Sequence, residues 1–205
     1  MKKFWKITCI CTFLAAVLLI ASVAQDRLSL GRQLIRLHVV ANSDSQEDQA
    51  LKLQVRDRVL EYLQGSMEEE EDTQKAKLYL QEHLRDIEEE VNSFLQSRGI
   101  HDSAVVTLGK ETFGVRDYDT FSLPSGVYES LRITIGQGEG KNWWCVVFPR
   151  LCLPAANRDF ADVAVGAGFS QSLVPTLQRE EDYEVRFFLL DVLGKIENFF
   201  FQIRN

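Results

Sequence analysis

A chain of 205 residues with a formal net charge of −7 is long enough to bury a hydrophobic core and usually forms one domain. Its acidity argues against nucleic acid as a partner, because proteins that bind nucleic acids present excess positive charge to the phosphates. Its three histidines and four cysteines show no metal-ligand spacing such as C-x-x-C or H-E-x-x-H, so we predict no metal and no cofactor.

The N-terminus has the pattern of an export signal. Three lysines within the first six residues precede an uncharged, largely apolar run over residues 7–24. Ser22 and Ala24 place small residues at the two positions that a signal peptidase reads, so we favour cleavage before Gln25. An uncleaved anchor is the competing hypothesis, because a run of about 18 residues is near the lower limit for spanning a bilayer.

The chain is therefore expected to divide into a signal peptide or signal anchor, residues 1–24, and a single globular domain, residues 30–205. Removing the first segment takes three lysines and no acidic residue, which changes the formal net charge from −7 to −10. A globular part this acidic is not expected to bind anionic lipid, so we predict membrane contact only through the N-terminal segment.

A strand and a polar turn follow the N-terminal segment. Residues 34–41 alternate in a way that predicts a strand with one apolar face and one mixed face. The turn after it carries Asn42, Ser43, Asp44 and Ser45, whose short side-chain oxygens suit the free N–H groups of a helix first turn. We therefore expect Ser43 and Asp44 to cap the helix that follows.

That helix is predicted to be amphipathic. Leu51, Val55 and Val59 fall on one stripe, which must pack against the strand layer. Three charged residues form a second stripe at four-residue spacing, namely Asp48, Lys52 and Arg56. We expect this charged stripe to be exposed.

The remaining elements are predicted from the same periodicities. Residues 73–96 suit a single helix, and residues 103–110 suit a strand. Two apolar runs, 128–135 and 142–148, are predicted to pair as a long hairpin, and residues 185–203 follow a helical template. The resulting fold class is a two-layer α+β sandwich, in which amphipathic helices pack on a mostly antiparallel or mixed sheet. Residues 155–179 show no assignable pattern.

The glycine-rich link between the two hairpin strands is predicted to be structural. Gly136, Gly138 and Gly140 have the spacing G-x-G-x-G, which differs from the nucleotide-binding pattern G-x-G-x-x-G. The link joins two strands, so no helix N-terminus is available to hold a pyrophosphate. We expect these glycines to allow positive φ in a tight connection.

A hydrolase is the main alternative function that the residues suggest. His38 could act as a base with Ser43 or Cys145 as the nucleophile. However, the chain lacks a nucleophile-elbow signature such as G-x-S-x-G, and helix capping explains Ser43 and Asp44 without chemistry. The structural interpretation of His38 is local hydrogen bonding near Arg36.

Two further pairs lie in or near the second apolar run. Cys145 and Cys152 are the only cysteines outside the export segment, and either a disulfide or two free thiols is compatible with an oxidising compartment. Trp143 and Trp144 point to opposite faces of one strand, so at least one belongs to the core. The other is either buried as well or exposed as an anchor for a protein partner.

Two stretches resemble a known family. The run HVVANSDSQEDQALKLQVRDRVLEYL, from His38 to Leu63, resembles the N-terminal signature of the stage II sporulation protein R family of endospore-forming bacteria. The run LPSGVYESLRITIGQGEGKNWWCVVFPRLC, from Leu123 to Cys152, resembles the family's leucine-proline-x-glycine turn and its tryptophan- and cysteine-containing block. Residues 155–179 match no motif of the family.

The resemblance implies a function without catalysis by this chain. Members of the family are secreted across the cytoplasmic membrane, from the forespore into the space between the forespore and mother-cell membranes. There they activate an integral membrane protease of the aspartic type, which matures a mother-cell sigma factor precursor. The resemblance therefore favours an exported sporulation signalling protein, and a secreted hydrolase using His38 with Ser43 or Cys145 stays the alternative. Eight residues are candidates for contacting the protease: Asn42, Ser43, Asp44, Asp48, Lys52, Arg56, Trp143 and Trp144.

Overall fold

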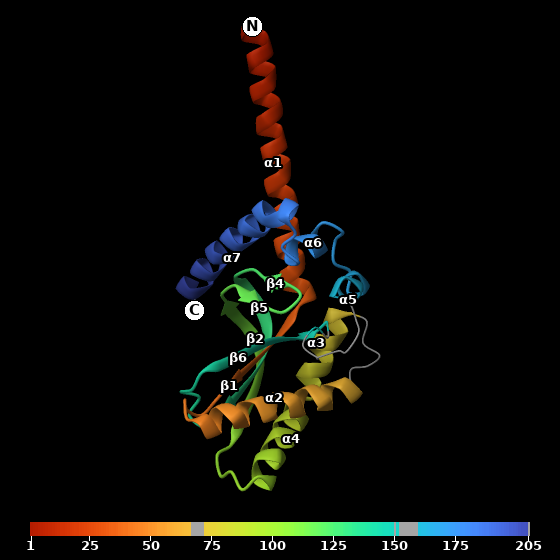
Figure 1. Cartoon of the computed structure of the whole chain (residues 1–205). Helices are drawn as coiled ribbons and strands as arrows, with labels where there is room; N and C mark the ends of the chain where they lie inside the picture. The colour runs from red at the N-terminus through yellow and green to blue at the C-terminus, as the bar shows by residue number, and fades with distance from the viewer. Residues whose placement is uncertain (67–71, 150, 152–159, 205) are drawn as a thin grey trace. The chain divides into compact units, whose positions relative to one another are not determined.

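The computed structural model describes residues 1–66, 72–149, 151 and 160–204 (Figure 1). Its elements follow one another as α1 (Lys2–Gln33), β1 (Ile35–Val40), α2 (Gln46–Ser66), α3 (Thr73–Glu82), α4 (Leu84–Ser97), β2 (Ala104–Phe113), β3 (Arg116–Asp117), β4 (Ser122–Leu123), β5 (Gly126–Ile135), β6 (Asn142–Phe148), α5 (Phe160–Gly166), α6 (Leu173–Leu177), the 3-10 helix η1 (Glu181–Tyr183) and α7 (Glu184–Arg204). The predicted α+β class is confirmed.

The chain divides into two compact units. The helical unit comprises Met1–Gly31, Thr112–Val127 and Phe169–Asn205, and the sheet unit comprises Arg32–Glu111 and Tyr128–Gly168. The single domain expected for residues 30–205 stays a prediction.

Strand β1 lies inside the four-stranded sheet, whose order is β2-β5-β1-β6. It pairs with β5 in parallel and with β6 antiparallel, so β5 and β6 are not neighbours. The prediction that they form a hairpin is therefore wrong. The reason is that all six residues of β1 are buried, and a strand buried on both faces finds partners for its backbone on both sides only in the sheet interior.

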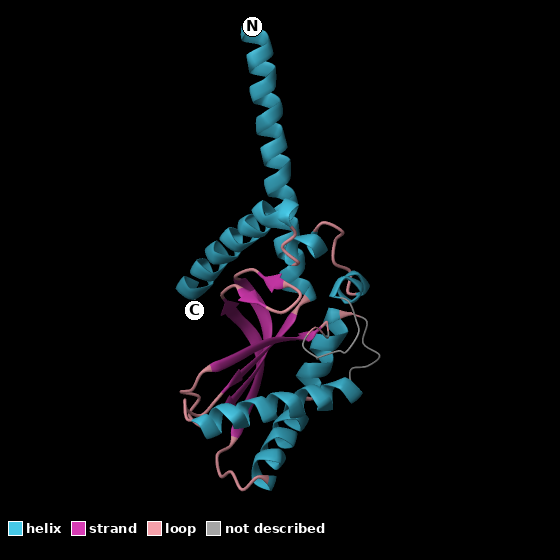
Figure 2. Ribbon diagram, in the orientation of Figure 1, coloured by secondary structure: helices cyan, strands magenta, loops and turns pink. Residues whose placement is uncertain are grey.

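One face of the sheet is covered by α2, α3 and α4 (Figure 2). The predicted stripe of Leu51, Val55 and Val59 packs there against Leu37 and Val39 in one hydrophobic cluster. Burying apolar side chains of this size stabilises a fold by roughly 1.5–3 kcal/mol each. The amphipathic pattern of the sequence therefore identified the covered face correctly.

The helix predicted over residues 73–96 is broken at His83. Asp72 caps α3 by accepting hydrogen bonds from the backbone N–H groups of Gln74 and Lys75. The ring of His83 stacks on Tyr79, and its Nδ1 lies 2.9 Å from the Tyr79 carbonyl oxygen. This local contact accompanies the end of α3, and α4 starts at the next residue.

Helix α4 also protects the outer edge of β2. The Ala104 N–H donates to Asn92 Oδ1, and Asn92 Nδ2 donates back to the Ala104 carbonyl. The Val106 N–H donates to Glu88 Oε2 at 2.9 Å. These side chains occupy edge groups that would otherwise be open to pairing with another chain.

Helix α1 is the one helix in the described part of the chain that is long and apolar enough to cross a membrane. An N-terminal apolar helix fits secretion or membrane anchoring. The helix does not end at Ala24, the predicted cleavage point, but continues to Gln33. After Ala24 the helix is part of the folded protein, because Asp26, Arg27 and Leu30 are buried.

The link from β5 to β6 passes the end of β1 and is held there by its backbone. Gly136 and Gly138 have φ of 56° and 66°, so the expected positive φ is found at these two glycines. The Gly140 N–H donates to the Ala41 carbonyl at 2.9 Å. A methyl group at Gly140 would overlap the Ser43 carbonyl, so this glycine is required by close approach of two backbones.

We expect Gly140→Ala to lower the free energy of unfolding by roughly 1–3 kcal/mol, because an added methyl group must displace backbone atoms. The matched control is Gly109→Ala in β2, where an added Cβ meets no atom and φ is not positive. That control should be neutral or slightly stabilising. Urea unfolding of the two variants checks the prediction, and equal stability would contradict it.

Candidate functional site

The polar turn after β1 forms a hydrogen-bond network with the start of α2. Ser43 Oγ and Asn42 Nδ2 donate to Asp48 Oδ2 at 2.6 and 3.1 Å. The hydrogen bond from Ser43 lowers the pKa of the Asp48 carboxyl, and the one from Asn42 adds to this against the opposing effect of burial. The network therefore holds Asp48 as a carboxylate.

The same turn also binds the glycine-rich link. Asn42 Oδ1 accepts from the Gln137 N–H at 2.9 Å, and Asp44 Oδ1 accepts from the Lys141 N–H at 2.7 Å. Among the candidate contact residues, Asn42, Ser43, Asp44 and Asp48 thus lie together, as the sequence grouped them. Their hydrogen bonds join parts of this unit to one another, which is a structural role.

The helix cap differs from the predicted one. Ser45 Oγ accepts the Asp48 N–H at 3.1 Å, so Ser45 caps α2, whereas Ser43 and Asp44 do not. Ser43 Oγ instead accepts from the Ser45 N–H while it donates to Asp48. The reason is geometric, since α2 begins at Gln46 and the residue immediately before it occupies the capping position.

The charged stripe of α2 is not uniformly exposed, which corrects the expectation for Lys52. The Lys52 residue is only 4% exposed, and its Nζ donates to Gln49 Oε1 at 2.6 Å and to the Lys141 carbonyl at 2.9 Å. Burial lowers the pKa of the Lys52 ammonium, although the charge of Asp44 opposes this effect. Lys52 therefore ties α2 to the glycine-rich link.

Arg56 lies half-buried one turn further along α2. Its guanidinium sits over the Trp143 ring, 4.4 Å from the ring centroid, and it also pairs with Asp57 at 2.7 Å. The Trp143 ring packs against the hydrophobic cluster, and its side-chain N–H has no hydrogen-bond partner in the described residues. Arg56 and Trp143 thus form a cation–π pair at the margin of the core.

The opposite face of the sheet carries a second polar cluster around His38. Its Nδ1 lies 3.2 Å from Glu111 Oε2, and its Nε2 lies 3.0 Å from Asn142 Oδ1. Trp144, its cross-strand neighbour, stacks on the imidazole with ring centroids 3.8 Å apart. Arg132 adds an ion pair to Glu111 at 3.0 Å. Trp143 packs against the core on the helix-covered face, whereas Trp144 stacks on His38, so the two indoles lie on opposite faces of the sheet. Both residues are half-buried.

Electrostatics stabilise the ionised form of Glu111. Burial alone would raise the pKa of its carboxyl, but the hydrogen bond with His38 and the positive charge of Arg132 lower the pKa overall. Sequence analysis missed Glu111, Arg132 and Asn142 as partners of His38. Arg132 and Asn142 lay in predicted strands, but only the sheet order places β1 beside both β5 and β6.

The groups proposed for a hydrolase do not converge. Cys145 is disulfide-bonded and belongs to the hydrophobic cluster on the helix-covered face, whereas His38 lies on the other face. Ser43 Oγ is engaged by Asp48 and Ser45. Cys152 lies outside the described residues, so its pairing with Cys145 stays a prediction, while Cys9 and Cys11 are free.

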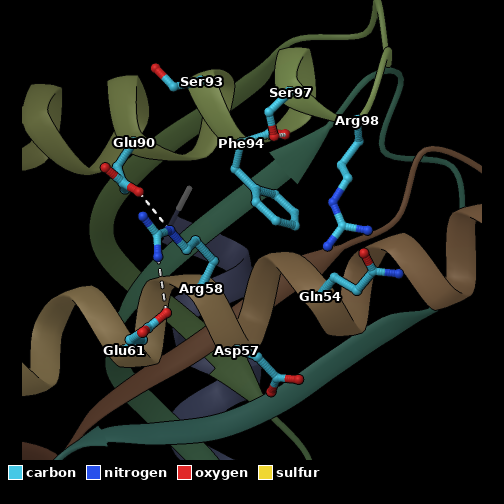
Figure 3. Close-up of a pocket in the computed structure, with 9 residues that line it drawn as sticks. All are labelled: Gln54, Asp57, Arg58, Glu61, Glu90, Ser93, Phe94, Ser97 and Arg98. Atoms are coloured by element: carbon cyan, nitrogen blue, oxygen red, sulfur yellow. Dashed lines mark hydrogen bonds and ion pairs between the residues drawn. The ribbon is translucent and has the colours of Figure 1, made fainter.

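A charged groove of about 720 Å³ lies between α2 and α4 (Figure 3). Arg58 crosses it, donating to Glu90 Oε1 at 2.6 Å and to Glu61 Oε2 at 3.0 Å. At the other end the Arg98 guanidinium lies over the Phe94 ring, 5.1 Å from the centroid. Within the described ranges, no three His, Cys, Asp or Glu side chains are grouped to hold a metal ion.

Comparison with known proteins gives one family and one curated relative. The family described as Stage II sporulation protein R matches residues 31–158. Stage II sporulation protein R of Bacillus subtilis (strain 168) is 36% identical over 120 residues, which cover 58% of this chain and 54% of the relative. The chain thus matches about half the length of that relative. No solved structure matches the chain.

We expect Lys52→Glu to destabilise the protein by roughly 3–5 kcal/mol, because it places a carboxylate among the oxygens that now accept hydrogen bonds from Lys52. Lys75→Glu on α3 is the control, since Lys75 is exposed and a surface change costs less than about 0.5 kcal/mol. Thermal and urea unfolding compare the two. A loss at Lys52→Glu no larger than the control would contradict the buried role.

We expect Glu111→Gln to weaken the fold at pH 7 by roughly 1.5–3 kcal/mol, since a hydrogen-bonded charge is lost. The folded-state pKa of Glu111 lies below its ordinary value of 4.5, so its ionised form contributes stability above about pH 4.5. That contribution disappears as the pH falls through the folded-state pKa. Urea midpoints from pH 7 to pH 3 should therefore fall less steeply for Glu111→Gln than for the parent, and parallel curves would refute the assignment.

Proposed function

This chain belongs to the stage II sporulation protein R family, and we propose that it is an exported signal that activates a membrane-embedded protease during endospore formation. The match over residues 31–158 carries the proposal, because it covers β1, the polar turn, α2 and the whole four-stranded sheet. The membership makes it a sporulation protein and favours signalling over catalysis. In this proposal the protease, of the aspartic type, matures a mother-cell sigma factor precursor.

The N-terminal helix supports export. Helix α1 contains the uncharged run of residues 7–24 and meets the length and composition of a membrane-crossing segment. Such a segment directs the remainder of the chain across the cytoplasmic membrane. We propose that the sheet unit then acts in the space between the forespore and mother-cell membranes, where it meets the extracytoplasmic part of the protease.

The arrangement of side chains favours a docking role over hydrolysis. A hydrolase needs a nucleophile within hydrogen-bond reach of its base. The disulfide-bonded Cys145 lies on the face opposite His38, and Ser43 Oγ is engaged in the turn network. We therefore propose no catalytic residue for this chain.

The proposed contact surface comprises two parts of α2, the Arg56 side chain beside Trp143 and the residues that line the groove. Arg56 and Trp143 form a stacked pair of the residue types that dominate binding energy in protein interfaces. Arg58 follows two residues later and projects from a different side of α2, into the groove, with a side chain that is 43% exposed. Lys52, being buried, is better assigned to holding α2 in place. Asn42, Ser43, Asp44 and Asp48 shape the adjoining turn.

The proposal predicts loss of activation by Arg56→Glu and Arg58→Glu without loss of the fold. Each variant is added to vesicles that contain the candidate protease and its sigma factor precursor, and precursor cleavage is measured beside thermal stability. We expect the double variant to lower the cleavage rate at least tenfold, which corresponds to about 1.4 kcal/mol of interaction. Lys75→Glu, an exposed charge reversal on α3, is the matched control and should keep the parent rate.

Two results would count against the proposal at different levels. Normal cleavage with the double variant would remove both of these parts of α2 from the contact surface. Absence of cleavage with the parent chain, when the protease is shown to be competent by another route, would remove the proposed activity itself.

A further inference from the structure

Helix α7 presents an apolar stripe to solvent. Six of its residues are 49–68% exposed, namely Val185, Phe188, Ile196, Phe199, Phe200 and Ile203. At 100° per residue they fall on one side of the helix, with the half-buried Leu189 and Val192 between them. A contiguous apolar surface of this kind, exposed to solvent, marks an interaction site.

The other side of α7 is already seated within the helical unit. The Ser125 N–H donates to Asp191 Oδ1 at 3.0 Å, and a methyl group at Gly194 would overlap the Ser125 carbonyl. Asn198 Nδ2 donates to the Phe113 carbonyl at 2.8 Å. Because these contacts fix the helix about its axis, α7 does not turn its stripe inward.

Two ion pairs join α7 to α1 immediately after the apolar run of residues 7–24. Arg186 binds Asp26 at 2.6 Å and donates to Ser22 Oγ at 3.2 Å. Arg27 binds Glu197 at 2.5 Å. All four ion-paired side chains belong to the helical unit, and three of them are at most 15% exposed. The start of α7 is therefore held at the level where α1 would leave a bilayer.

The composition of α7 fits the interface of a neutral bilayer. Phe188, Phe199 and Phe200 supply aromatic rings, which together with aliphatic side chains form the buried face of interfacial helices. Its ionisable residues are balanced in charge: Glu184, Arg186, Asp191, Lys195, Glu197 and Arg204. Attraction to anionic lipid requires an excess of basic residues, which α7 lacks.

We propose that the apolar stripe of α7 lies in the interfacial layer of the membrane from which α1 emerges. The occupant is a lipid surface, because the Arg186–Asp26 ion pair holds the start of α7 beside the end of the lipid-compatible segment of α1. Two contacts, α1 and α7, then orient the helical unit on the membrane. This extends membrane contact beyond the N-terminal segment and does not depend on protease activation.

Photocrosslinking from α7 tests the proposal. The full chain carries benzoylphenylalanine in place of Phe188 or Phe199 and is reconstituted in phosphatidylcholine vesicles. The control replaces Gln202, which is exposed on the same helix but lies outside the stripe. After illumination, mass spectrometry should find a lipid adduct at positions 188 and 199 with at least fivefold higher yield than at position 202.

Three outcomes would overturn the proposal. An adduct with the mass of two chains would assign the stripe to a second copy. If the yield of lipid adduct at both stripe positions is no higher than at position 202, the stripe lies outside the bilayer. An adduct to the protease, formed in place of the lipid adduct when the two proteins share vesicles, would assign the stripe to a protein partner. Two separate reporter positions keep the test valid if one variant does not fold.

Discussion

The central position of β1 is the constraint on which the sheet unit depends. All six residues are buried, so the backbone groups of the strand must be paired with β5 on one side and β6 on the other. Even Arg36 is fully buried, where its Nε donates to the Cys145 carbonyl and its guanidinium lies over the Tyr128 ring. Because β1 separates β5 from β6, their link must cross the end of β1. That crossing brings the glycines against the turn at Asn42–Asp44.

This crossing gives several of the residues that suggested binding a structural role as well. A buried or closely approached backbone needs hydrogen-bond partners. Side-chain oxygens of the turn accept hydrogen bonds from the Gln137 and Lys141 N–H groups, and Lys52 Nζ donates to the Lys141 carbonyl. Sites for a partner must then lie where side chains remain accessible. On the sheet unit these places include Arg58 and the charged groove that it lines, and the exposed Asp44 of the turn.

The helical unit places charged contacts directly after an apolar segment. Asp26 and Arg27 are consecutive residues of α1, yet each pairs with a different position on α7. Asp26 and Arg27 thus belong to the folded helical unit, although they directly follow the apolar run. An exposed stripe of apolar side chains this long marks an interaction surface on α7, and the lipid surface that we propose for it rests on the ion pairs that hold α7 to α1.

The local elements could be predicted because their periodicities are properties of short stretches. The stripe from Leu51 to Val59, the strand at 34–41 and the helix at 185–203 were found in this way, as was the positive φ of Gly136 and Gly138. The break at His83 was missed, because apolar spacing continues through it and only a ring contact with Tyr79 distinguishes the site.

What the sequence by itself determined is the longer strands and most of the longer helices, the apolar N-terminal segment, the family and the residues of the polar turn. Tertiary structure decided the order of the strands, the burial of Lys52 and the partners of His38. Each of these depends on residues far apart in the chain, such as the 73 positions between His38 and Glu111. Periodicity shows which face of an element is apolar, but it does not specify which other element lies beside it.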